Sequence, residues 1–399
     1  MEAAYIVDIV RTPVGKFGGT LASMRPDDLA AHVITSLLSR NCSLDAKLLE
    51  DVVFGAANQA GEDNRNVARM ALLLAEQPIE VGGVTVNRLC ASGLQSIMDA
   101  SRALMLGEGQ ANIAGGVESM TRARLVTGKS QVAFGRNVET YDTTIGWRFI
   151  NPQLAKLHYP FSMGETAENV AAKWNITREQ QDRFAHSSQV KYQKAHEAEL
   201  FESQLAPVLV SQRKSDPITF DKDEHPRLSS IEKLATLKPA FKEGGTVTAG
   251  NSSGINDGSA AALIVNESAL NEMGAQPMAR VVSMAVAGVS PDCMGVGPIP
   301  ATKKALKRAG LTVNNIDLIE LNEAFASQSL ACIRDLGLDP HIVNVNGGSI
   351  AIGHPLGASG TRISATLIHE MQRRESVKYG LATMCIGVGQ GAAVIYEKV

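Results

Sequence analysis

Short apolar runs alternate with segments of helical periodicity over the first 120 residues. The run from Ala4 to Val10 ends at Thr12-Pro13 and predicts a buried strand. Pro26-Asp27-Asp28 precedes apolar residues spaced for one helix face, with the acidic first turn that a helix dipole favours. The alternation continues with strands at 51–55, 84–86 and 111–115 and helices at 67–74 and 93–106. This order predicts a mostly parallel sheet covered by helices.

The last third of the chain repeats the same order. Strands are predicted at 279–287, 317–321, 343–346 and 379–384, with helices at 301–309, 327–336 and 357–371. An acidic residue opens the second strand in both parts (Asp51 and Asp317). A Val-Asn step leads from a strand into a glycine-bearing loop in both (Val86-Asn87 and Val345-Asn346). We therefore predict an α/β fold made of two duplicated units.

The middle of the chain has a different composition. Polar residues, prolines and arginines dominate from about residue 120 to 245, with amphipathic helices expected at 165–173 and 178–200. Long insertions of this kind usually carry substrate binding. We expect an N-terminal half at 1–120 plus 246–273, a loop domain at 121–245 that covers the substrate site, and a C-terminal half at 274–399.

Composition narrows the classes of partner. The 399 residues are 44% apolar and 20% charged, with a formal net charge of -3, as in an ordinary globular protein. No basic cluster suggests nucleic acid, so small molecules are the expected partners. No stretch approaches the ~18 apolar residues of a membrane span, and the first residues lack a signal-peptide pattern. A cytoplasmic protein without membrane contact is expected.

Two cysteines and one histidine stand in suggestive positions. Five cysteines occur without any C-x-x-C pair, so neither a metal site nor disulfides are expected. Cys90 lies where a strand gives way to a helix, whose N-terminus favours a thiolate. Cys385 follows the last apolar strand in a glycine-rich loop, and His354-Pro355 lies among five glycines. Taken singly, such a cysteine or histidine is more often structural.

Their common location at the ends of predicted strands favours a catalytic role over a structural one. Asn322 also follows a strand, and ligands of open α/β sheets bind at the carboxyl ends of strands. A nucleophile, its base and a second acid/base, with Asn322 and loop amides as oxyanion donors, fit acyl transfer through a thioester. Gly128-Lys129-Ser130 is not a P-loop, because Ala123 stands where its first glycine is needed. No G-x-G-x-x-G follows a strand, so dinucleotide binding has no support.

Seven motifs together resemble the thiolase family over essentially the whole chain. They are N-R-L-C-A-S-G at Cys90, G-G-V-E-S-M at Gly115, M-G-E-T-A-E-N at Met163, G-T-V-T-A-G-N-S-S-G at Gly245, N-E-A-F at Asn322, G-H-P-L-G-A-S-G at His354 and C-I-G-V-G-Q-G at Cys385. The resemblance implies a five-layered α/β fold of duplicated βαβαβαββ halves with an inserted loop domain. It also implies a homodimer or homotetramer.

The resemblance assigns roles to individual residues. Cys90 is expected to take the acyl group after activation by His354, and Cys385 to act as the second acid/base. Asn322, through a water, and His354 are expected to bind one thioester oxygen, and the amides of Cys90 and Gly387 the other. Coenzyme A is a co-substrate, no cofactor is permanently bound, and the residues matching its binding region are Met163, Arg227, Ala249 and Ser253.

Two departures point away from acetoacetyl-specific biosynthetic thiolases. Those enzymes carry a histidine where Ser162 stands, and Val388 replaces a glycine common in the C-I-G-G-G loop. Three stretches are most similar to 3-oxoadipyl-CoA thiolases of aromatic-compound degradation: A-N-Q-A-G-E-D-N-R-N-V-A-R at Ala57, D-T-T-I-G-W-R-F-I-N-P at Asp142 and L-A-T-M-C-I-G-V-G at Leu381.

The substrate hypothesis is therefore 3-oxoadipyl-CoA, cleaved with CoA to succinyl-CoA and acetyl-CoA in the β-ketoadipate pathway. Its free carboxylate needs a cationic partner, for which Arg148 is the first candidate. Other candidates in the loop domain are Arg122, Arg124, Lys156 and His158. A thiolase of fatty acid β-oxidation or of acetoacetyl-CoA remains the alternative. A catalytically silent CoA- or lipid-binding protein would lack one of Cys90, His354 and Cys385, and a decarboxylating condensing enzyme would arrange its histidine and asparagine differently.

Overall fold

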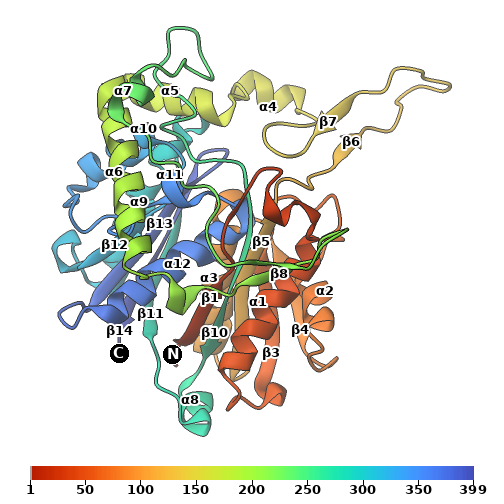
Figure 1. The fold of residues 1–399 in the computed structure, drawn as a ribbon, viewed down its shortest axis with the longest axis vertical. Helices are drawn as coiled ribbons and strands as arrows, with labels where there is room; N and C mark the ends of the chain where they lie inside the picture. Colours follow the sequence, from red (N-terminus) through yellow and green to blue (C-terminus); the bar gives the residue numbers. More distant parts are fainter. Residues whose placement is uncertain (1) are drawn as a thin grey trace.

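A ten-stranded sheet with helices on both faces forms the body of the protein, in a computed structural model that describes residues 2–399 (Figure 1). Its strands are β1 (Tyr5–Arg11), β2 (Gly15–Lys16), β3 (Leu49–Gly55), β4 (Gly82–Val86), β5 (Ala111–Ser119), β10 (Asn256–Val265), β11 (Ala279–Gly288), β12 (Leu318–Leu321), β13 (Tyr379–Ile386) and β14 (Gln390–Lys398). Two small hairpins are β6 (Leu125–Thr127) with β7 (Thr140–Asp142) and β8 (Val208–Val210) with β9 (Ile218–Phe220). The α-helices are α1 (Pro26–Arg40), α2 (Val67–Leu74), α3 (Ser92–Met105), α4 (Pro152–Leu157), α5 (Met163–Lys173), α6 (Arg178–Glu197), α7 (Ile231–Ala235), α8 (Glu267–Met273), α9 (Pro298–Ala309), α10 (Ala326–Leu336), α11 (Ser349–Ile352) and α12 (Leu356–Arg373).

The strand order confirms the predicted duplication. In the first half the order is β4-β3-β5-β10-β1, with the first two pairs parallel and the next two antiparallel. In the second half a parallel bridge at Val343 is followed by β12-β13-β14-β11, with the same sequence of parallel and antiparallel pairs. The halves meet where β1 pairs antiparallel with β11, at two residue pairs only.

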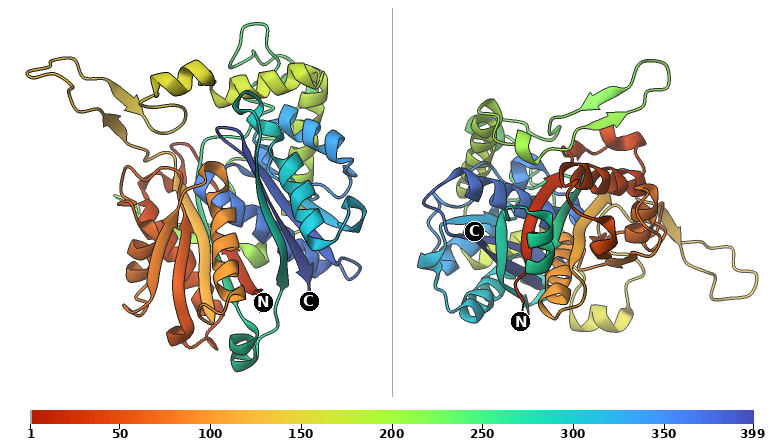
Figure 2. Two further views of the ribbon diagram at one scale, coloured as in Figure 1. Left: turned by 180° about the vertical axis from the view of Figure 1, so that it is seen from behind. Right: turned by 90° about the horizontal axis from the view of Figure 1, so that it is seen from below.

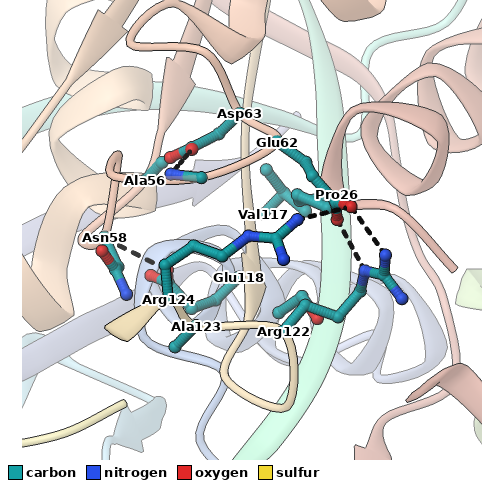
Figure 3. Close-up of a pocket in the computed structure, with 12 residues that line it drawn as sticks. Pro26, Ala56, Asn58, Glu62, Asp63, Val117, Glu118, Arg122, Ala123 and Arg124 are labelled. Atoms are coloured by element: carbon teal, nitrogen blue, oxygen red, sulfur yellow. Dashed lines mark hydrogen bonds and ion pairs between the residues drawn. The ribbon is translucent and has the colours of Figure 1, made fainter. Parts of the chain in front are cut away.

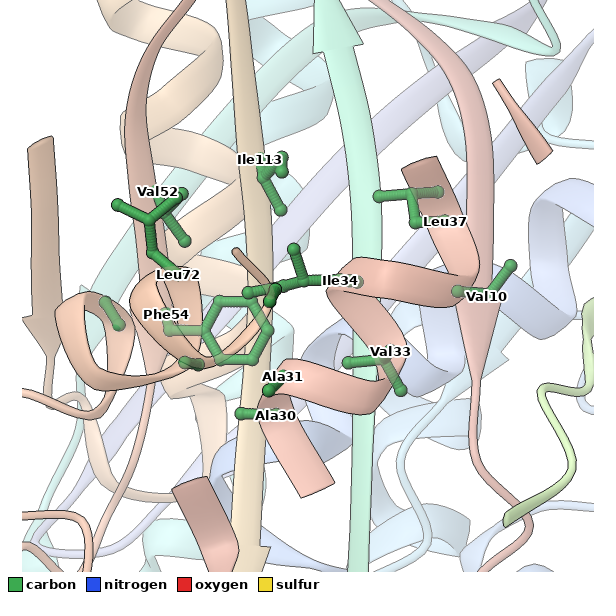
Figure 4. Close-up of a cluster of buried hydrophobic side chains, with 14 of the residues drawn as sticks. Val10, Ala30, Ala31, Val33, Ile34, Leu37, Val52, Phe54, Leu72 and Ile113 are labelled. Atoms are coloured by element: carbon green, nitrogen blue, oxygen red, sulfur yellow. The ribbon is translucent and has the colours of Figure 1, made fainter. Parts of the chain in front are cut away.

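Three apolar clusters divide the body into five layers. Figure 4 shows the first cluster, in which Ile34 of α1 and Leu72 of α2 pack on one face of the first half-sheet. The second cluster fills the space between the half-sheets with α3 and α12, which contribute Ile97 and Ile363. The third packs α9 and α10 on the outer face of the second half-sheet, with Leu306 against Ile395. The five-layered fold class is confirmed.

The two central helices approach each other closely through glycines. A side chain at Gly93 on α3 would collide with the carbonyl of Gly357, and one at Gly360 on α12 with the backbone of Leu94. Glycine is therefore required at this contact because only hydrogen fits between the backbones. The N-terminal ends of α3 and α12 consequently meet at the boundary of the halves.

The prediction of a mostly parallel sheet is wrong at its centre. The hydrophobic pattern did not predict the long antiparallel strands β10 and β14, because both begin with small and polar residues, most of which have low β-propensity. All ten residues of β10 are buried between β1 and β5. Burial between neighbouring strands thus outweighs intrinsic propensity there.

The strand predicted at 343–346 is reduced to a single bridge at Val343. Asn344 has a φ of 45°, in the left-handed region, which an extended strand does not adopt. Its side-chain amide replaces the backbone ladder, since Oδ1 accepts from the Leu321 N–H and Nδ2 donates to the Leu321 carbonyl, both at 2.8 Å. The chain therefore turns where the pattern predicts that it continues.

The middle segment lies outside the layered body. Helices α5 and α6 run along the second half, and an arm that carries β6 and β7 extends away from the first half (Figures 1 and 2). Among residues 2–399, no helix combines the length and apolarity needed to cross a membrane.

Candidate active site

Cys90 lies in a tight turn at the start of α3. Leu89, one residue earlier, has a φ of 47°, a strained value for a branched side chain. The Ser92 hydroxyl holds the turn, accepting from the Arg88 N–H at 2.9 Å and donating to the Leu89 carbonyl at 2.6 Å. The turn leaves the Cys90 side chain half-buried at the wall of a cavity.

This cavity has a volume of about 330 Å³ and opens beside the Cys90 thiol. Its lining is mainly apolar and comes from both halves and from the middle segment. The lining residues are Ala57, Asn58, Leu89, Cys90, Thr143, Thr144, Ile145, Gly146, Trp147, Arg148, Met163, Leu356, Gly387 and Val388. Such a lining suits an acyl or pantetheine chain.

Burial dominates the electrostatics of the Cys90 thiol. It raises the pKa of the Cys90 thiol to about 11, although the N–H groups of Gly387 and of Cys90 itself hydrogen-bond the sulfur and favour the thiolate. The helix N-terminus was expected to favour a thiolate, but loss of solvent outweighs it. Cys90 is therefore a neutral thiol at rest and needs a base to become a nucleophile.

His354 is held by both its backbone and its ring. Its N–H donates to Asn256 Oδ1 at 2.9 Å, its Nδ1 lies 2.6 Å from Ser359 Oγ, and its Nε2 lies 3.4 Å from Asn322 Nδ2. Burial, together with the nearby positive charge of Arg362, lowers the pKa of His354 to about 3. The imidazole is therefore neutral and has a free lone pair for accepting a proton.

Asn322 is fixed at the end of β12. Its N–H donates to the Thr383 carbonyl at 3.0 Å, and its Oδ1 accepts from Ser349 Oγ at 2.5 Å. This arrangement turns the amide nitrogen toward His354. The structure thus brings together two residues that the sequence predicted as partners.

Cys385 is the next-to-last residue of β13 and is 1% exposed, just before Gly387 and Val388 of the cavity wall. Burial and the proximity of Cys90 raise its pKa well above that of an ordinary thiol. Its apolar neighbours include Met163 and Phe325. The two thiols lie close enough for a charge on Cys90 to raise the pKa of Cys385.

Glu118 links two walls of the site, and sequence reasoning assigned it no role. Its carboxylate accepts from the N–H groups of Ala57 and Gly357 at 2.9 Å and of Asn58 at 3.2 Å. Burial raises its pKa to about 7. The G-G-V-E-S-M motif was the available signal, because a charged residue inside a fully buried strand needs partners.

The five candidate partners for a substrate carboxylate differ in whether they line the cavity at Cys90. Arg148 lines the cavity, and within residues 2–399 its guanidinium has no ion pair or hydrogen bond. Arg122 and Arg124 instead bind Glu62, at 2.6 and 2.7 Å, on a different small cavity (Figure 3). Lys156 and His158 are exposed beyond the lining.

The residues expected at coenzyme A lie in two places. Met163 lines the cavity and begins α5, which Ser162 caps through a capping box with Glu165. Arg227 donates to the Ala249 carbonyl at 2.5 Å, and Ser253 donates to the Ala324 carbonyl from both its N–H and its hydroxyl. The loop at 249–253 is thereby joined to the N-E-A-F segment, but Arg227, Ala249 and Ser253 do not line the cavity at Cys90.

The arrangement suits acyl transfer. A thiol, a neutral imidazole, a second thiol, an amide nitrogen and loop N–H groups can together attack a carbonyl, stabilise the oxyanion and move a proton. No group of three or more histidine, cysteine or acidic side chains in residues 2–399 is arranged to hold a metal.

A duplicated five-layer fold with paired cysteines and a histidine at the boundary of its halves defines the thiolase class of acyltransferases. The chain belongs to the thiolase family: the thiolase N-terminal domain matches residues 4–268 and the thiolase C-terminal domain residues 275–398.

Similar proteins of known activity span the whole chain. The 3-oxoadipyl-CoA/3-oxo-5,6-dehydrosuberyl-CoA thiolase of Escherichia coli K12 is 52% identical and a beta-ketoadipyl-CoA thiolase of Acinetobacter baylyi is 52% identical, each with 100% of both chains covered. Among solved structures, human mitochondrial 3-ketoacyl-CoA thiolase in complex with CoA has a TM-score of 0.92 at 39% identity. The match covers 100% of this chain and 98% of the human one.

Proposed function

We propose that this thiolase cleaves 3-oxoadipyl-CoA with CoA to give succinyl-CoA and acetyl-CoA. The observation that carries the choice of substrate is Arg148, a cation without a protein partner in the cavity of Cys90. The names of the 52% identical relatives support it. The degradation of aromatic compounds is the metabolic context that this substrate implies.

The first half-reaction breaks a carbon–carbon bond. His354 takes the proton of Cys90, whose sulfur attacks the 3-keto carbon of the substrate. The bond between carbons 2 and 3 then breaks, and Cys385 gives its proton to the departing acetyl-CoA carbanion. Succinyl-Cys90 remains. Asn322 with His354, and the N–H groups of Cys90 and Gly387, stabilise the two oxyanions.

The second half-reaction transfers the acyl group to CoA. Cys385, now a thiolate, removes the thiol proton of CoA, and the CoA sulfur attacks the succinyl thioester. Cys90 leaves and regains its proton from His354. The cycle is ping-pong, because acetyl-CoA departs before CoA attacks.

Arg148 provides the discrimination between chains. A terminal carboxylate in an apolar cavity needs a charge partner, and a planar guanidinium offers two parallel N–H donors. A fatty acyl chain would offer this half-buried cation no partner. We therefore assign the far end of the substrate to the wall formed by residues 143–148.

Coenzyme A is assigned to Met163 inside the cavity and, outside the lining, to the loop that carries Ala249 and Ser253 together with Arg227. Segment 121–245 acts as the loop domain that covers it, between the halves at 1–120 plus 246–273 and 274–399. Exposed apolar side chains on the edge strand β4 and along the β6–β7 arm, such as Val84 and Phe134, support a homodimer or homotetramer. The proposed location is the cytoplasm.

The purified enzyme tests this proposal directly. It is incubated with CoA and, separately, 3-oxoadipyl-CoA, acetoacetyl-CoA and 3-oxooctanoyl-CoA, and the acyl-CoA products are quantified by mass spectrometry. A kcat/KM for 3-oxoadipyl-CoA at least roughly tenfold above the others supports the dicarboxylate assignment. Faster cleavage of 3-oxooctanoyl-CoA would assign the enzyme to fatty acid β-oxidation instead.

A further inference from the structure

A chain of five hydrogen bonds runs from a buried arginine through Asn322 and His354. Arg362 Nη2 lies 2.5 Å from Ser349 Oγ, which lies 2.5 Å from Asn322 Oδ1. Asn322 Nδ2 is 3.4 Å from His354 Nε2. From the other side of the ring, Nδ1 is 2.6 Å from Ser359 Oγ, which is 2.8 Å from the Pro355 carbonyl.

The first member of this chain fixes the direction of every later bond. A guanidinium has only donors, so Ser349 must accept from Arg362 and is left with one proton to give. Among residues 2–399, Asn322 Oδ1 is the only acceptor that this hydroxyl reaches. The amide oxygen of Asn322 therefore faces Ser349, and its NH₂ group faces His354.

The histidine tautomer follows from the orientation of this amide. Because Asn322 donates from Nδ2, His354 Nε2 must present its lone pair. The ring proton then lies on Nδ1 and is donated to Ser359 Oγ, which gives its own proton to the Pro355 carbonyl. With the amide flipped, the fully buried Ser349 hydroxyl would have no acceptor, and Ser359 would lose its bond to Pro355.

Arg362 has few other hydrogen-bond or ion-pair partners that would compensate the cost of burying its charge. It is 1% exposed on α12, and its Nε and Nη1 have no hydrogen-bond partner in the described chain. Its nearest acid, Glu320, is 3.8 Å away and also has an unpartnered oxygen. A buried charge that is satisfied this incompletely does not stabilise a core, so a role in the site accounts for it better.

We propose that Arg362, acting through Ser349, is a positioning residue that sets the amide orientation of Asn322 and the tautomer of His354. The neutral ring then presents its Nε2 lone pair as the base for Cys90. After Nε2 takes the thiol proton it becomes a donor, while the other ring proton remains on Nδ1 and is still donated to Ser359 Oγ. This inference rests on the proposed role of His354 as the base in thiolysis.

The tautomer is measured by nitrogen NMR of the full-length enzyme labelled with ¹⁵N-histidine, with the His354 signals assigned by their loss in His354→Gln. The wild type is expected to show a protonated Nδ1 and an unprotonated Nε2. Ser349→Ala is expected to mix or reverse this pattern and to lower kcat roughly tenfold or more, with KM changed less than about twofold. Arg362→Lys keeps a donor-only cation and is expected to retain the wild-type tautomer.

Ser364→Ala is the matched control. Ser364 is also fully buried and also makes two hydrogen bonds, to the Gly360 carbonyl and Tyr396. It is not part of the series of hydrogen bonds that runs from Arg362 to Pro355. It is expected to keep both the tautomer and kcat. A wild-type His354 protonated on Nε2, or an unchanged tautomer and kcat in Ser349→Ala, would overturn the inference. Because the NMR readout needs no substrate, failure of the substrate assignment would leave this test intact.

Discussion

The N–H of Gly387, from the second half of the molecule, donates a hydrogen bond to the thiol of Cys90, from the first half. Burial raises the pKa of this thiol to about 11 despite that bond. In the proposed mechanism the sulfur becomes charged only as His354 removes its proton, and the Gly387 N–H is already in place to stabilise the charge. Under that mechanism, both halves are needed for Cys90 to react.

Cys90→Ser should abolish formation of the acyl-enzyme. A serine hydroxyl is a far weaker acid than a thiol, and His354 with a pKa of about 3 is a weak base. Intact-mass spectrometry after incubation with acetyl-CoA should show one acetyl adduct on the wild type and none on the variant. An adduct that persists in Cys90→Ser would move the nucleophile to another residue.

Cys385→Ala should separate the two kinds of bond cleavage. A CoA thiolate is a good leaving group, so transfer from acetyl-CoA to Cys90 should still occur. The acetyl-CoA carbanion needs a proton donor, so kcat for thiolysis should fall by roughly 10²–10⁴. The adduct is measured by mass and thiolysis by product formation. Normal carbon–carbon cleavage by this variant would contradict the assignment of Cys385.

Arg148→Ala should impair 3-oxoadipyl-CoA and spare acetoacetyl-CoA. Loss of a charge-assisted hydrogen bond of about 1.5–3 kcal/mol corresponds to a fall in kcat/KM of roughly 10–100-fold for the dicarboxylate alone. Lys156→Ala removes an exposed cation outside the cavity and serves as control. Equal losses with both substrates would show that Arg148 supports the loop rather than the carboxylate.

Val388→Gly should stabilise the protein. Val388 has a φ of 63°, a left-handed conformation that a β-branched residue adopts only with strain. Relief of that strain outweighs the added freedom of glycine in the unfolded chain. The free energy of unfolding should therefore rise by about 1 kcal/mol. Urea unfolding measures the gain, and Val388→Ala, which keeps a Cβ, should gain less. A destabilised Val388→Gly would show that packing of the valine side chain dominates.

Acid should destabilise the fold partly through His369. Burial lowers its pKa to about 4, while an unfolded histidine titrates near 6.5. Its stabilising contribution is complete above pH 6.5 and is lost as the pH falls toward 4, because the unfolded chain binds the proton first. Between pH 7 and 5.5, His369→Gln should lose about 1 kcal/mol less unfolding free energy than the wild type. Urea unfolding at both pH values measures the difference, with His341→Gln at an exposed position as control.

Periodicity predicted the helices and the duplication well. The helix expected at 67–74 is α2 with the same bounds, and the predicted helices at 93–106 and 357–371 are α3 and α12 within two residues. Such segments carry their signal in the spacing of large apolar side chains. Strands β10 and β14 begin with small and polar side chains, so their identity depends on neighbours that are distant in sequence.

Site residues divide in the same way. Cys90, Asn322, His354 and Cys385 stand in recognisable local contexts, and the structure places them at one boundary. Ser349 and Arg362 have no such context. Their proposed role depends on the groups that they contact in the folded structure, from α11 and α12. The sequence also could not predict that Arg122 and Arg124 pair with Glu62 instead of lining the cavity at Cys90.

The internal symmetry of the fold gives Cys90 and His354 matching positions. Cys90 lies two positions before the first residue of α3, and His354 two positions before the first residue of α12, so the two occupy equivalent places in the two halves. In an ancestor assembled from two identical chains, one gene would have supplied the same residue at both places. Two halves in a single polypeptide allow these positions to differ, as the proposed roles of Cys90 as acid and His354 as its base require.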